Sequence, residues 1–134
     1  MSNFFVKRIL MVATTLLALF TTSNLVRADV KDYEFQLVDQ TVKKGEAILL
    51  VRLILKPDGR PVANAVIFAK RLDIAPDGIT EMKTMIEALP STEPGIYKFK
   101  AQMTMAGGWQ LSLGAKVQGE AGTLNSRLVF QAVP

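Results

Sequence analysis

Apolar and polar residues alternate along most of the chain beyond residue 30, and this period of two limits the fold more than any other feature. Successive side chains of a β-strand point to opposite faces, so an alternating segment forms a strand that is buried on one side. The clearest alternation spans residues 96–105, where one face is expected to carry Tyr97, Phe99, Ala101, Met103 and Met105. No segment of helical length shows the 3.6-residue period, so the pattern predicts an all-β protein.

The same reasoning predicts other strands along the chain. Residues 109–117 and 124–132 each place their apolar side chains on one inward face. Residues 46–55 form a nearly continuous apolar run, which suits a central strand. The next strand is predicted to place Val66, Phe68 and Leu72 on one face.

Turn-forming residues separate these segments. Proline presets φ and glycine accepts a positive φ, so runs that are rich in either residue end strands. Such runs occupy residues 56–61, 73–81, 90–95 and 119–122, and residues 82–89 fit one short strand. About seven short strands with turns at this spacing are typical of an immunoglobulin-like β-sandwich. We expect this sandwich to be a single domain over residues 29–134.

Residues 1–28 have the layout of an N-terminal signal peptide. Lys7 and Arg8 precede an apolar run at residues 9–20, and Ala28 fits a cleavage point. The run is too short to cross a bilayer, which requires about 20 apolar residues. We therefore expect a periplasmic protein, with an uncleaved leader anchored in the inner membrane as the alternative.

Charge and composition exclude several kinds of function. The chain carries a net charge of +4, but three of its 16 basic residues lie in the predicted leader, which leaves 13 basic and 12 acidic residues in the domain. This balance gives no basic surface for nucleic acid. The chain has no Cys and no His, which excludes Ser–His and Cys–His catalysis and zinc sites of Cys or His type. Carboxylates remain as groups that could catalyse acid–base chemistry, but we do not expect an enzyme.

The methionines of the domain fall in two short segments. Met82 and Met85 follow one turn, and Met103 and Met105 end the clearest strand. Thioether sulfur selects Cu(I), and these are the only soft ligands in the domain. Met82, Met103, Met105 and Asp77 are therefore candidate metal ligands. The competing interpretation is that Met103 and Met105 only fill the core, because methionine packs readily in irregular gaps.

Two other segments are candidate contact sites for a ligand or a partner. Asp73, Pro76 and Gly78 belong to a turn-rich loop, and exposed loops often carry function. Trp109 follows a glycine pair and offers a ring on which a small molecule could stack. Turn formation alone explains the first segment, and a core position explains Trp109.

Residues 71–82, 93–99 and 103–120 together resemble the YtkA-like/FixH-like group of exported bacterial domains. The resemblance implies an immunoglobulin-like sandwich outside the cytoplasmic membrane and an accessory role without catalysis. It also implies copper handling, beside efflux systems or in the assembly of copper-containing oxidases. Members often have Met where this chain has Ile74 and Ile79, so Met82, Met103 and Met105 are the matching positions that remain.

Three functions are consistent with the sequence. The first is an exported accessory protein that binds Cu(I) weakly, or a partner such as an efflux adaptor or another envelope protein. The second is an interaction module without metal, which adds a partner's strand to its sheet edge. The third is a binder of a small aromatic molecule near Trp109. Cu(I) is the only cofactor that these residues favour.

Overall fold

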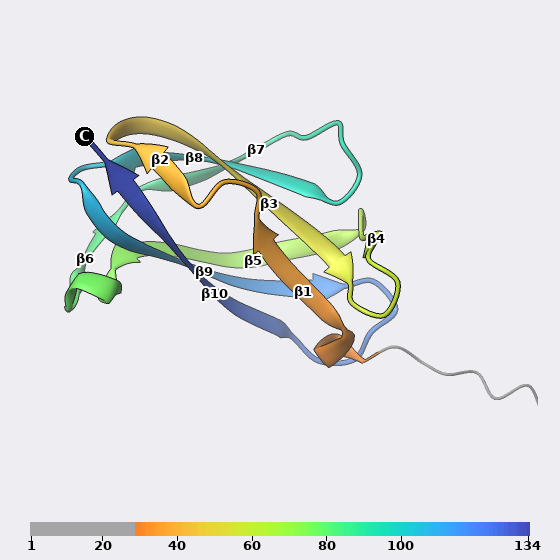
Figure 1. The fold of residues 1–134 in the computed structure, drawn as a ribbon. Coiled ribbons are helices and arrows are strands. Elements are labelled where there is room, and N and C mark those ends of the chain that lie inside the picture. Colours follow the sequence, from red (N-terminus) through yellow and green to blue (C-terminus); the bar gives the residue numbers. More distant parts are fainter. Residues whose placement is uncertain (1–28) are drawn as a thin grey trace, which may run out of the picture.

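Residues 29–134, which the computed structural model describes, form a sandwich of two β-sheets (Figure 1). The predicted leader, residues 1–28, lies outside the described residues. The first sheet has the order β1-β3-β8-β7, and a short β4 also pairs with β3. The second sheet has the order β2-β10-β9-β5-β6. Every pair of neighbouring strands is antiparallel except β2 and β10, which are parallel.

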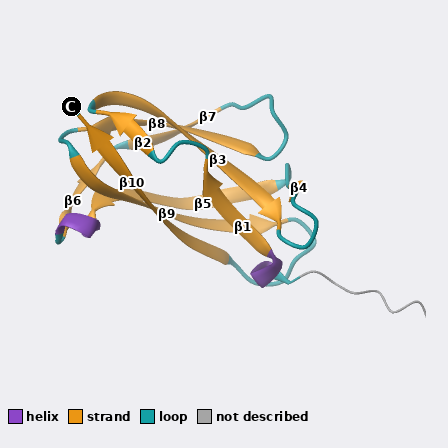
Figure 2. Cartoon of the chain, viewed as in Figure 1, coloured by secondary structure: helices purple, strands orange, loops and turns teal. Residues whose placement is uncertain are grey.

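The elements have the following bounds (Figure 2). The first sheet contains β1 (Tyr33–Leu37), β3 (Gly45–Leu55), β4 (Arg60–Pro61), β7 (Ile86–Leu89) and β8 (Ile96–Met103). The second sheet contains β2 (Thr41–Lys43), β5 (Ala65–Ile74), β6 (Ile79–Thr84), β9 (Gly107–Val117) and β10 (Leu124–Val133). Two 3₁₀ turns accompany them, η3 (Val30–Asp32) and η4 (Ala75–Asp77). Within residues 29–134, no helix is long and apolar enough to cross a membrane.

This architecture confirms the predicted all-β, immunoglobulin-like sandwich. The strands with five residues or more are β1, β3, β5, β6, β8, β9 and β10, which agrees with the expected count of about seven. The shorter β2, β4 and β7 account for the difference from the ten strands observed.

The core lies between the two sheets and is built from their inward faces. β3 contributes Leu49, Val51 and Leu53, and β9 contributes its apolar residues from Trp109 to Val117. Burying one such large side chain stabilises the fold by about 1.5–3 kcal/mol. The domain has no disulfide, so this apolar packing is the main source of its stability.

The inward face of β5 differs from the prediction. The sequence predicts Val66, Phe68 and Leu72 on one face, but Val66 and Phe68 are 66% and 57% exposed, whereas Leu72 is buried. The pairing of β5 with β9 shifts by one residue between Ile67 and Ala69. Such a bulge changes which side chains face the core, because successive residues point to opposite sides of a sheet. Ile67 therefore points inward and Phe68 outward.

Residues 73–89 also differ from the prediction of one loop and one strand. β5 continues to Ile74, and β6 begins at Ile79. β6 pairs with β5 in the second sheet, whereas β7 pairs with β8 in the first. The chain therefore crosses from one sheet to the other at Met85, between β6 and β7.

Candidate functional site

The two loop motifs of the sequence contact each other at one end of the sandwich. The backbone N–H of Gly108 donates a hydrogen bond to Oδ2 of Asp77, with a donor–acceptor distance of 3.1 Å. A Cβ on Gly107 would overlap the Asp77 carboxylate, and a Cβ on Gly108 would lie 2.9 Å from Cβ of Pro76. The glycine pair is therefore needed for η4 to lie against the start of β9. Gly78 ends η4 with a φ of +87°, a left-handed conformation that favours glycine.

A second hydrogen bond joins the same two parts of the chain further along. Oγ1 of Thr84, at the end of β6, donates to the carbonyl oxygen of Gln102 in β8 at 2.8 Å. The segment from Asp77 to Thr84 is thus tied at both ends to the segment from Gln102 to Gly108. We call this region, residues 77–84 and 102–108, the methionine corner.

Three of the four methionines of the domain belong to the methionine corner. Met82 is 46% exposed and Met105 is 38% exposed, whereas Met103 is fully buried. Met82 and Thr84 lie on the same side of β6 because side chains alternate along a strand. Thr84 contacts β8 through its hydrogen bond, and Met82 precedes it by two residues on the same side of β6.

Met105 does not continue the core face, which contradicts one expectation from the sequence. β8 ends at Met103, so the alternation that places Tyr97, Phe99 and Met103 inward stops two residues before Met105. Met85 lies at the crossing between the sheets and is 87% exposed. Met85 follows Met82 by three residues, and in a strand an odd spacing puts two side chains on opposite sides.

Trp109 holds the turn that carries Met105. Its side chain is buried, and its indole Nε1–H donates to the carbonyl oxygen of Met105 at 3.0 Å. A buried ring has no free face for a stacked ligand, so the position of Trp109 favours the core interpretation over the aromatic platform. The sequence showed a tryptophan after a glycine pair but did not reveal its link to Met105.

The two aspartates have structural partners. The buried carboxylate of Asp73 accepts a hydrogen bond from Nε of Arg71 at 2.8 Å and another from the backbone N–H of Ala75 at 3.0 Å. Asp77 holds the backbone at Gly108. Within the described residues, no three His, Cys, Asp or Glu side chains form a group that could hold a metal ion.

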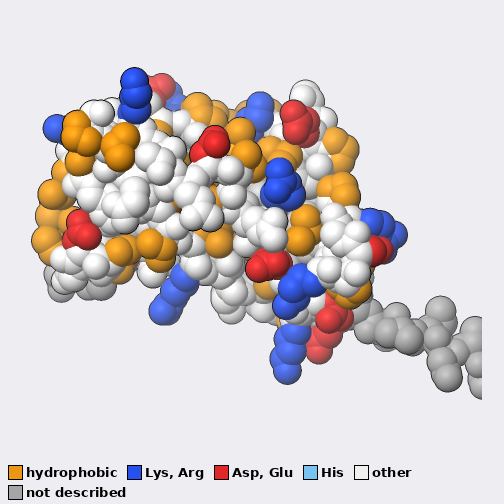
Figure 3. All heavy atoms as spheres, in the orientation of Figure 1, with side chains coloured by type: hydrophobic (Ala, Val, Ile, Leu, Met, Phe, Trp, Pro, Cys, Tyr) orange, Lys and Arg blue, Asp and Glu red, His pale blue; other side chains and the backbone are white. Residues whose placement is uncertain are grey.

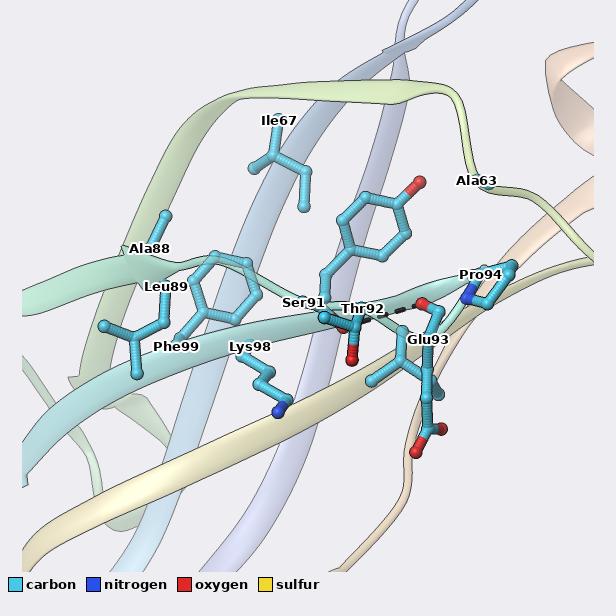
Figure 4. Close-up of a pocket in the computed structure, with 13 residues that line it drawn as sticks. Ala63, Ile67, Ala88, Leu89, Ser91, Thr92, Glu93, Pro94, Lys98 and Phe99 are labelled. Atoms are coloured by element: carbon cyan, nitrogen blue, oxygen red, sulfur yellow. Dashed lines mark hydrogen bonds between the residues drawn. The ribbon is translucent and has the colours of Figure 1, made fainter.

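A separate cleft lies at the open side of the sandwich, between β5 and the β7–β8 hairpin. Its volume is about 460 Å³, and Figure 4 shows Ile67 and Phe99 on opposite sides of it. Ala88 and the loop at residues 91–95 complete the wall. The sequence did not predict this cleft, because its walls come from strands of different sheets.

Tyr97 closes one end of the cleft. Its hydroxyl donates to the carbonyl oxygen of Val62 at 2.7 Å and accepts from the backbone N–H of Ala65 at 3.2 Å. Burial raises the pKa of the Tyr97 hydroxyl because it disfavours the charged phenolate, and the Ala65 N–H acts in the opposite direction as the smaller cause.

The raised pKa of Tyr97 predicts a loss of stability in alkali. The unfolded chain releases this proton near pH 10.0, whereas the folded chain retains it to a higher pH. The contribution of Tyr97 is therefore complete below pH 10 and declines as the pH rises toward the folded pKa. Urea unfolding from pH 7 to 11 should show a steeper alkaline decline for the native protein than for Tyr97→Phe. Equal declines would contradict this, and Tyr33, whose pKa is also raised, is common to both proteins.

The surface around these features does not carry charged side chains of a single sign. Figure 3 shows basic and acidic side chains interspersed over one face of the molecule, with apolar side chains between them. The nearly equal numbers of basic and acidic residues in the domain agree with this view.

Comparison with known proteins adds one family match and two structural likenesses. The family model described as YtkA-like matches residues 27–114. The Lin-41 filamin domain is 16% identical, with a TM-score of 0.47 over 80% of this chain and 95% of that one. The ZirS C-terminal domain is 12% identical, with a TM-score of 0.45 over 84% of this chain and 75% of that one. No curated protein sequence matches this chain.

Proposed function

Since the chain belongs to the YtkA-like family, we propose that it is an exported accessory protein that holds Cu(I) weakly at the methionine corner. It has no catalytic role in this proposal, and Cu(I) is cargo that it receives and passes on. Its place is the periplasm, where residues 1–28 direct it, beside an efflux adaptor or another envelope protein that takes the ion.

One observation carries the metal part of the proposal. The hydrogen bonds Thr84–Gln102 and Asp77–Gly108 tie two distant segments together, and Met82 and Met105 lie between these ties. Both side chains are partly exposed, so an ion can reach them from solution. The buried Met103 belongs to the same segment as Met105 and would supply a third thioether.

The chemistry of the donors accounts for weak and transient binding. Thioether sulfur is neutral, so it holds Cu(I) without the charge that a thiolate supplies, and it disfavours harder ions. No imidazole is present to bind more tightly. Trp109 holds the turn at Met105 in place through its hydrogen bond, and this lowers the entropy lost when an ion binds.

A Cu(I) titration of residues 29–134 against a competing chelator tests the proposal. Replacing Met82 and Met105 together by leucine should weaken binding by about tenfold or more, because leucine keeps the volume but removes the soft ligand. The matched control is Met85→Leu, which removes an exposed thioether outside the corner and should leave the affinity unchanged. An affinity that survives the double replacement would show that the corner does not bind Cu(I).

A further inference from the structure

β5 has a free backbone edge along its first part. It pairs with β9 from Ala65 to Asp73, but β6 pairs with it only from Leu72 to Ile74. Among residues 29–134, no strand pairs with the other edge of residues 66–70, which we call the β5 window. An unpaired edge presents a row of N–H and C=O groups that another extended chain can use.

The cleft described above lies directly behind the β5 window. Ile67 of the window forms one wall, and Ala88 and Phe99 of the first sheet form the other. Figure 4 shows that Leu89 and Lys98 point away from Ile67. The charge of Lys98 therefore lies outside the space between the sheets, which Ile67, Ala88 and Phe99 line with apolar side chains. A strand added to β5 would direct every second side chain into this space, because side chains alternate.

The window is closed at both ends. Tyr97 occupies the backbone N–H of Ala65 at one end, and β6 begins to pair at Leu72 at the other. The free stretch is about 17 Å long at 3.3 Å per residue. A short extended segment fits between these ends, whereas the β5 of a second whole domain would bring its own β6 and loops against them. The closed ends therefore favour a peptide over a second copy.

Charge and exposure specify the segment further. Val66 and Phe68 are exposed apolar residues on the outer side of the window, and an added strand would cover them. Lys70 is an exposed residue of β5 at the end of the window, and it lies beside Ala69 and Arg71 in a surface hollow of the second sheet. No acidic side chain in the described part of the chain forms an ion pair with Lys70. An acidic residue in the segment would complement this charge.

We propose that the β5 window binds a short extended peptide segment of a partner protein, with apolar residues at alternate positions and an acidic residue next to Lys70. The segment adds a strand to the second sheet and fills the cleft with its inward side chains. This inference is independent of Cu(I), because the window and the methionine corner share no residue.

The probe is a synthetic peptide of about seven residues that alternates valine and threonine, made in two versions with glutamate at either end. Residues 29–134 contain the ten strands and the core that the structure describes, so this domain is used for binding by fluorescence anisotropy and for amide hydrogen exchange. At least one version should bind with a Kd below about 1 mM. Exchange should slow by about fivefold or more at the amides of residues 66–70 only.

Three variants test the details of the site. Ala88→Trp fills the cleft and should weaken binding by about tenfold or more. Its matched control, Val129→Trp, places the same ring on an exposed position of β10, in the sheet that contains β5, and should not affect binding. Lys70→Glu should shift the preference from the glutamate peptide to one that carries lysine instead, a reversal that unfolding cannot produce.

Several results would overturn the proposal. One is that neither glutamate peptide binds at 1 mM. Another is that the protected amides lie on β1 or β7, or that methylating alternate peptide nitrogens leaves the affinity unchanged. A third is that the domain forms a dimer and that Ala88→Trp dissociates this dimer, which would show that a second copy occupies the window. None of these results bears on the Cu(I) titration, so the two proposals fail separately.

Discussion

Replacing Trp109 with alanine is expected to lower the free energy of unfolding by about 4 kcal/mol, because it removes the largest side chain of the core and leaves a cavity. It also removes the donor to the carbonyl oxygen of Met105. For a domain of this size the melting temperature should fall by roughly 15–20 °C. Urea unfolding followed by far-UV circular dichroism measures the change without the tryptophan signal.

Trp109→Phe separates packing from the hydrogen bond. Phenylalanine keeps most of the buried apolar area but has no donor, so we expect a smaller cost of about 1–2 kcal/mol. The methionine corner should nevertheless loosen, and exchange of the amides near Met105 should quicken. A loss below about 1.5 kcal/mol for the alanine variant would show that Trp109 is not central to the core.

Replacing Gly107 with alanine is expected to cost about 3 kcal/mol and to detach η4 from β9. Two causes add to this cost. Gly107 has a φ of +136°, where a side chain is strained, and a Cβ there would overlap the Asp77 carboxylate. Detachment would also open the methionine corner, so the affinity for Cu(I) should fall with the stability.

Gly119→Ala is the matched control for this prediction. Gly119 also has a positive φ, of +87°, but a Cβ there would meet no atom within 4 Å. This variant should show only the conformational cost, about 1 kcal/mol. Adding Asp77→Ala to Gly107→Ala should recover part of the loss, since it removes the overlap. If Gly107→Ala costs no more than Gly119→Ala, the contact with Asp77 contributes nothing.

The strand faces that depend on local alternation were predictable, and those that depend on distant contacts were not. In β10 the expected inward residues Phe130 and Ala132 are buried. In β5 the prediction failed at Val66 and Phe68 because of the bulge. The ring of Phe68 lies 3.2 Å from the point where a Cβ of Gly114 would sit. The outward position of Phe68 therefore depends on the absence of a side chain at Gly114, in another strand. Nothing in the sequence near Phe68 indicates that contact.

The candidate site shows the same division. The Pro76–Gly78 turn and the Gly107–Gly108 pair were both recognised as motifs, but their contact through Asp77 is tertiary. The sequence predicts Met105 on the core face, because the alternation of apolar residues continues to residue 105. The strand stops at Met103, and the chain turns where Trp109 bonds to Met105. The cleft beside β5 arises only when the two sheets pack together.

The parallel pair of β2 and β10 has a consequence for how fast the domain folds. It joins Thr41 to Gln131, about 90 positions apart in the chain. Closing so long a loop costs entropy before its contacts form, and domains rich in such pairings fold in milliseconds to seconds. β10 also pairs with β9 over most of its length, from Leu124 opposite Ala115 to Ala132 opposite Gly107. Folding is therefore expected to finish only after the last strand is present, and a chain that still lacks residues 124–133 should remain unfolded.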